Sequence, residues 1–155
     1  AVLPRLLEEF LGAVPSSAHP MDIVRTGVSL LGMVDPDAAD HSHDANVRKS
    51  VRLLAQLPLM VASSYRLVNG KPQIRPREDL SFAENLLYLL TGRVGDDQAK
   101  AMARVLGVSL TLYAEHEFNA STFAARVTAS TMTDLYSAIT SAIGALNLPL
   151  HGGAN

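Results

Sequence analysis

The sequence predicts an all-α fold of about seven helices, and three observations favour this fold class. Nearly every periodic segment repeats its apolar residues at steps of three and four, which is the period of a helix. No segment alternates convincingly between apolar and polar residues, as a half-buried strand does. Residues that typically cap helices, and glycines or prolines that typically stop them, stand at the ends of these segments. We therefore expect strand content near zero.

The composition is that of one globular domain, or of one part of a larger domain, in a chain of 155 residues. Hydrophobic residues make up 48% of the chain, which is enough for a packed core. The formal net charge is −2, so we expect no nucleic-acid partner and no attraction to an anionic membrane. Cysteine is absent, which excludes disulfides and thiolate metal sites and is compatible with a reducing compartment.

The longest uncharged run, from Leu135 to Leu150, does not resemble a membrane span. It is too short, and too rich in Ser, Thr and Asn, to cross a bilayer as a helix. The first residues of the sequence show no signal-peptide pattern. We therefore expect a soluble, cytoplasmic protein with no membrane partner.

The first half of the chain is predicted to form three helices, at Leu3–Leu11, Pro20–Gly32 and about Asn46–Val68. Pro20 suits the first position of a helix because that position needs no backbone N–H donor. Gly32 is expected to mark the end of the second helix. Pro58 lies inside the third helix, where it removes a backbone hydrogen bond and should bend the axis.

Four further helices are predicted from residues whose side chains cap helix N-termini. In chain order these candidate caps are Asp79 or Ser81, Asp96, Asn119 or Ser121, and Thr133 or Asp134. The last helix then runs to Leu146, with apolar residues at three- and four-residue steps.

The last two helices carry almost no charge, and a helix that is apolar or small on every side is buried all round, inside a large protein or at a subunit contact. One face of the last helix consists of small residues, namely Ser137, Thr140, Ser141, Gly144 and Ala145. Small residues allow another helix to approach closely. We therefore predict a twofold homodimer in which the uncharged helix Leu135–Leu146 and the long helix around Pro58 take part.

His41 and His43 stand in the run DHSHD at residues 40–44, which superficially resembles a metal site. Nothing else in the sequence positions a closed coordination shell there, and such loops are commonly just solvated. We therefore expect no metal, and a metal-binding helical protein stays a weaker hypothesis. His19 precedes a helix-opening proline and is most simply a cap or turn residue.

His116 and His151 differ from the other histidines because each adjoins a helix that is predicted to be buried. Taken alone, a histidine in such a place is more often a satisfied core residue than a catalyst. The two are far apart along the chain, so they meet only if the helices between them fold back antiparallel through the turn at Ser130–Thr133. We expect both imidazoles to face one cavity, with Asn119 near its edge.

Five segments of the sequence together resemble the citrate synthase family. They are AHPMDIVRT at residues 18–26, LLYLLTG at 86–92, EHEFNASTF at 115–123, DLYSA at 134–138 and LHGGAN at 150–155. They occur in the family's order and extend over nearly the whole chain, and citrate synthases and 2-methylcitrate synthases share them.

The resemblance implies an all-α enzyme, an acyltransferase of the tricarboxylic acid cycle, that condenses oxaloacetate with acetyl-coenzyme A and hydrolyses the citryl thioester. By position, His151 is similar to the family's catalytic histidine, which hydrogen-bonds the thioester oxygen as the enol forms. A histidine just before a helix N-terminus suits this role, because the positive end of the helix dipole disfavours imidazolium. His116 and Asn119 match oxaloacetate-binding residues, although helix capping is an equally good local role for Asn119.

The resemblance also implies a homodimer, with the coenzyme A thioester as a substrate and no tightly bound cofactor. Compared with the family, residues 1–155 are similar to part of the large helical domain, without its N-terminal start and its C-terminal catalytic part. We therefore expect these 155 residues alone to be inactive.

Two alternative functions stay open beside citrate synthase. A 2-methylcitrate synthase would use propionyl-coenzyme A, and one methylene in an apolar pocket is worth only about 1–3 kcal/mol, so the sequence does not decide between the two acyl groups. A non-catalytic helical dimerisation fragment would retain the histidines only by descent. The sequence likewise leaves open whether an effector regulates the enzyme.

Overall fold

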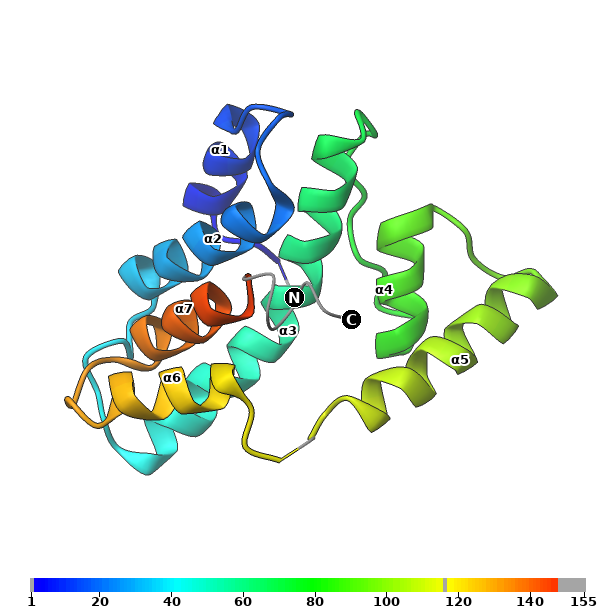
Figure 1. Cartoon of the computed structure of the whole chain (residues 1–155). Helices are drawn as coiled ribbons and strands as arrows, with labels where there is room; N and C mark the ends of the chain where they lie inside the picture. The colour runs from blue at the N-terminus through cyan, green and yellow to red at the C-terminus, as the bar shows by residue number, and fades with distance from the viewer. Residues whose placement is uncertain (1, 116, 148–155) are drawn as a thin grey trace.

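The computed structural model describes residues 2–115 and 117–147. These residues form seven α-helices and no β-strand, which confirms the predicted all-α fold. The helices are α1 (Arg5–Ala13), α2 (Pro20–Val34), α3 (His43–Val68), α4 (Phe82–Thr91), α5 (Asp97–Leu112), α6 (Ala120–Ala129) and α7 (Leu135–Leu146) (Figure 1). Among the described residues, none of the helices has the length and apolarity that a membrane span requires.

Side-chain caps determine where the last four helices begin, as the sequence predicts. The structure selects Ser81, Asp96, Asn119 and Asp134, each of which accepts a hydrogen bond from a backbone N–H of the first turn. At α4 the Glu84 carboxylate also accepts from the Ser81 backbone N–H at 2.9 Å, which completes a capping box.

Four predicted boundaries in the first half of the chain were wrong. α1 begins after Pro4 and not at Leu3, because a residue that precedes proline avoids the helical region. α1 also ends at Ala13 and not at Leu11. α3 begins three residues before Asn46, because the Ser42 hydroxyl caps it at the Ala45 N–H. α2 continues past Gly32 to Val34.

α1, α2, α3 and α7 share one hydrophobic core. Its fully buried members are Leu7, Val28, Leu31, Met60 and Tyr136. Gly32 explains how closely α2 approaches α7, because a Cβ at this position would lie 2.9 Å from the Cβ of Tyr136. Glycine at this point of α2 is therefore a packing residue and not a helix stop.

α4 and α5 form a second group of helices on the other side of α3 (Figure 1). α4 packs on the C-terminal half of α3, which continues through Pro58, and these helices bury Leu59, Ala62 and Leu89. The buried Arg66 guanidinium on α3 also donates to the backbone carbonyl of Leu90 at 3.2 Å. α5 packs chiefly on α4, where Leu87, Ala99 and Ala103 are buried.

Candidate functional site at the end of the helical hairpin

α6 and α7 fold back on each other as an antiparallel hairpin, as the sequence predicts (Figure 1). The Thr128 hydroxyl on α6 and the Ser141 hydroxyl on α7 lie 3.0 Å apart and hydrogen-bond across the pair. Ser141 belongs to the predicted small-residue face, so this face does contact another helix. The reversal brings Asn119, before α6, and Asn147, after α7, to the same end of the hairpin.

Asn119 uses its side-chain oxygen to cap α6. Its Oδ1 accepts a hydrogen bond from the Thr122 N–H at 2.7 Å. Capping, the local role predicted for this residue, is therefore confirmed. His116, the first of the two predicted site histidines, lies outside the described residues.

The backbone next to His116 adopts a conformation that is rare for an L-residue. Glu117 has φ 70°, in the left-handed region, and its N–H bonds to the Glu115 carboxylate at 2.6 Å. A non-glycine residue in this region costs on the order of 1–3 kcal/mol, and such strain collects at binding sites and switch regions. Glu117 is therefore held in a strained backbone conformation.

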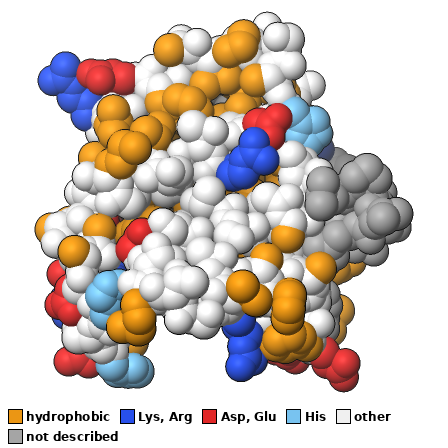
Figure 2. Space-filling view, turned by 60° about the vertical axis from the view of Figure 1, so that its left-hand side comes forward, with side chains coloured by type: hydrophobic (Ala, Val, Ile, Leu, Met, Phe, Trp, Pro, Cys, Tyr) orange, Lys and Arg blue, Asp and Glu red, His pale blue; other side chains and the backbone are white. Residues whose placement is uncertain are grey.

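Only one of the two nearly uncharged helices is buried within a single chain. α7 packs on both α2 and α6 and buries Tyr136, Ala138 and Ile143. None of the residues of α6 is buried, and Phe123 and Val127 are 59% and 51% exposed. Figure 2 shows a broad area of uncharged side chains and backbone on this side of the molecule, with most charged groups toward its edge.

α2 holds the C-terminal end of α7 through polar side chains. The Asn147 amide donates to the Asp22 carboxylate at 3.3 Å, and Arg25 pairs with the same carboxylate at 2.9 Å. His19 caps α2, because its Nδ1 accepts from the Met21 N–H, so the predicted cap role is confirmed. His151, the predicted catalytic histidine, lies four positions beyond Asn147 and outside the described residues.

α2 and α3 hold the other end of α7 through a network of ionic hydrogen bonds. The Asp35 carboxyl, 4% exposed, accepts from Arg52 and from the Tyr136 hydroxyl. Burial opposes ionisation, but the hydrogen bonds from Tyr136 and Arg52 outweigh it and lower the pKa of Asp35. Burial and the bond to Asp35 raise the pKa of Tyr136 to about 12. Hydrogen bonds from Arg48 and Arg52 lower the pKa of Asp37 below its usual range.

His41 and His43 occupy the start of α3. Ser42 between them caps the helix, and the Asp40 carboxylate accepts from the Ser42 N–H at 2.8 Å. Within the described ranges no three His, Asp or Glu side chains are placed to hold a metal ion. Local capping thus accounts for Ser42 and Asp40 in the DHSHD run.

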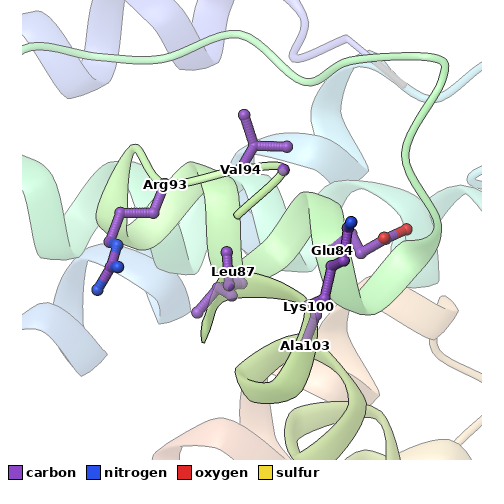
Figure 3. Close-up of a pocket in the computed structure, with 8 residues that line it drawn as sticks. Glu84, Leu87, Arg93, Val94, Lys100 and Ala103 are labelled. Atoms are coloured by element: carbon purple, nitrogen blue, oxygen red, sulfur yellow. The ribbon is translucent and has the colours of Figure 1, made fainter. Parts of the chain in front are cut away.

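A small pocket lies between α4 and α5 (Figure 3). Charged and apolar side chains line it together, namely Glu84, Leu87, Arg93, Val94, Lys100 and Ala103. Asn119, the one predicted substrate-binding residue that lies within the described ranges, does not line it.

The fold and the hairpin together define an all-helical domain with polar residues gathered at one hairpin end. The family model described as "Citrate synthase, C-terminal domain" matches residues 1–155, so the chain belongs to the citrate synthase family.

Relatives in this family include both enzymes suggested by the sequence motifs. The chain is 44% identical to citrate synthase 2 of Bacillus subtilis over 155 residues, covering 100% of this chain and 41% of that protein. It is 48% identical to the 2-methylcitrate synthase of Mycobacterium tuberculosis over 151 residues, covering 97% of this chain and 37% of that protein. The chain thus spans less than half the length of the relatives it matches.

A solved structure of the family has the same fold. The citrate synthase of Thermoplasma acidophilum, in a ternary complex with carboxymethyl coenzyme A and oxaloacetate, superposes with a TM-score of 0.86 at 27% identity. The match covers 99% of this chain and 39% of that chain.

Sequence reasoning missed the contact of Asn147 with Asp22. The two residues are 125 positions apart, and no local spacing links them. The strain at Glu117 was also missed, because a glutamate gives no sequence signal for positive φ.

Proposed function

We propose that the polypeptide carrying this chain is a citrate synthase-type acyltransferase that condenses oxaloacetate with acetyl-coenzyme A. The observation that carries this proposal is the antiparallel hairpin, which brings Asn119 and Asn147 to one end in a member of the citrate synthase family. Asn119 follows His116 by three positions and Asn147 precedes His151 by four. The two histidine segments therefore adjoin the same end of the hairpin.

In this mechanism His151 is the neutral donor that hydrogen-bonds the thioester oxygen as negative charge develops on it. A preorganised donor of this kind lowers the barrier because it is aimed at charge that appears only in the transition state. His116 and Asn119 bind oxaloacetate, whose two carboxylates favour charge-assisted hydrogen bonds. We propose no tightly bound cofactor, since coenzyme A enters as part of the thioester substrate.

A second candidate function, that of a 2-methylcitrate synthase, differs from the first in the acyl group of the thioester substrate. The chain is 48% identical to the 2-methylcitrate synthase of Mycobacterium tuberculosis. This similarity supports propionyl-coenzyme A as the alternative substrate of the enzyme proposed here. The ratio of kcat/KM for the two thioesters measures this preference directly, because specificity is a difference in transition-state binding. A ratio above one for acetyl-coenzyme A supports citrate synthase, and a ratio below one supports the alternative.

Release of free coenzyme A from the thioester, with and without oxaloacetate, tests the proposed reaction in the complete enzyme. His151→Ala should lower kcat by about 100-fold or more, because it removes a donor to the developing enolate. His116→Ala should mainly raise KM for oxaloacetate. Wild-type turnover in His151→Ala would overturn the assignment.

The 155 residues alone should show no condensation activity. They span 37–41% of the length of the two relatives described above, which supports our proposal that they are part of a larger helical domain. Condensation by this portion would contradict it. We also propose that the enzyme acts in the cytoplasm, an environment that suits a chain without cysteine.

We further propose a twofold homodimer that covers the exposed apolar side chains of α6. The exposure of Phe123 and Val127 on α6 supports this, since exposed apolar residues on neighbouring turns favour a protein partner. Val127→Lys should shift the protein toward monomer in sedimentation experiments. Val105→Lys is the matched control, because Val105 is 66% exposed on α5. An unchanged dimer in Val127→Lys would count against this interface.

A further inference from the structure

Asn147 joins the end of α7 to the first turn of α2. Its backbone N–H donates to the carbonyl of Ile143, as the last bond of the helix. Its side-chain amide donates to Asp22 Oδ1 at 3.3 Å. One residue thus ends the helix and ties that end to a second helix.

Asp22 is itself held in place. Arg25, three positions later on α2, pairs with the same carboxylate oxygen at 2.9 Å. The Cδ of Arg25 lies 3.9 Å from the Cβ position of Gly144, so the arginine stem reaches the last turn of α7. Asp22 and Arg25 therefore form a pair that contacts the end of α7.

The end of α7 has little else of its own to stabilise it. The last carbonyls of a helix have no donors within the helix, and a basic residue in the last turn commonly compensates the negative end of the dipole. α7 has no basic residue in its last turn. The side chains of Asp22 and Arg25, both on α2, contact this end of the helix instead.

From these contacts we infer that Asn147, held by Asp22, is a positioning residue for the segment that carries His151. This inference rests on the proposed function, in which His151 is the catalytic donor. Four residues span at most about 14 Å, so the point where the chain leaves α7 restricts where that segment begins. Misplacing a catalytic group by about 1 Å changes rates by about 100-fold.

Kinetics of the complete enzyme test the inference. Asn147→Ala should lower kcat by about tenfold or more and leave KM for oxaloacetate unchanged, because the variant displaces the donor and leaves the dicarboxylate site intact. Ser141→Ala is the matched control. It removes the 3.0 Å hydrogen bond between the side chains of Ser141 on α7 and Thr128 on α6. This bond also joins α7 to a neighbouring helix, but it does not involve the end of α7.

A swapped pair distinguishes positioning from simple loss of packing. In the double variant Asp22→Asn/Asn147→Asp the donor and the acceptor exchange places. We expect this variant to recover most of the kcat lost in Asn147→Ala, because it restores the hydrogen bond between the two helices with its direction reversed.

Two results would overturn the inference without touching the proposed function. One is a wild-type kcat in Asn147→Ala while His151→Ala is inactive. The other is an equal loss of kcat in Asn147→Ala and Ser141→Ala with no recovery in the swapped pair. Full activity in His151→Ala would instead refute the proposed function on which the inference rests.

Discussion

The Tyr136 hydroxyl donates a hydrogen bond to the Asp35 carboxylate, which joins the start of α7 to the residue that ends α2, 101 positions earlier. Tyr136 is 2% exposed, and Arg52 on α3 holds the same carboxylate through two further hydrogen bonds. Three helices therefore meet at one buried carboxylate. The position of α7 depends on this contact as well as on the apolar core.

Tyr136→Phe should destabilise the protein by about 1.5–3 kcal/mol, the usual range for a hydrogen bond to a charged group. Phenylalanine fills the same space, so the loss reports the hydroxyl and not a cavity. Urea unfolding measures it, and Tyr113→Phe serves as the control because Tyr113 is 72% exposed. Equal stability of the two variants would contradict a structural role for this bond.

Acidification should weaken the same network. The pKa values of Asp35 and Asp37 are lowered in the folded protein, so their contribution to stability is present above the unfolded value of about 4 and is lost as the pH falls through the folded values. Urea midpoints measured from about pH 6 to pH 3 should therefore decline. Arg52→Gln should flatten this decline, because it removes a partner of both carboxylates. A slope unchanged by the substitution would show that other groups cause it.

Gly32→Ala should cost about 1–3 kcal/mol, the typical penalty for overpacking a core. The new methyl group would lie 2.9 Å from Tyr136 Cβ, an atom that moves only if α7 moves. Gly12→Ala is the matched control, since Gly12 lies within α1 and a Cβ there meets nothing within 4 Å. Thermal melting should show Gly12→Ala as stable as the original protein or more stable. The prediction fails if both variants melt at the same temperature.

Asn119→Asp separates the capping role of this residue from its proposed substrate role. Aspartate caps a helix as well as asparagine does, so melting should be unchanged. The added negative charge should raise KM for oxaloacetate, because a carboxylate repels the dicarboxylate substrate. Asn119→Ala should lose both properties. If KM for oxaloacetate is unaffected in Asn119→Asp, capping alone explains this residue.

The parts of the structure that follow local rules were predictable from the sequence. Ser81, Asp96 and Asp134 cap their helices because a short polar side chain satisfies backbone donors a few residues away. The antiparallel reversal of α6 and α7 was expected through the turn at Ser130–Thr133. Local patterns also placed His19 correctly as a cap.

The errors concern contacts between distant residues. Gly32 was predicted to end α2 because glycine commonly stops a helix, but Tyr136 requires it inside the helix. Asp22 and Asn147 meet only because α2 and α7 pack together, which no local pattern encodes. The family resemblance supplied the roles of His116 and His151, since their local sequences alone would equally fit core histidines.

The attachment of α5 to the rest of the chain chiefly through α4 has a consequence for native-state hydrogen exchange. A helix with few buried side chains opens locally at a lower free energy than the global unfolding of its protein. α5 buries only Ala99 and Ala103, whereas α2 buries five residues, three of them in the core shared by α1, α2, α3 and α7. The amide protons of α5 should therefore exchange with deuterium before those of α2, which stay protected until the whole core opens.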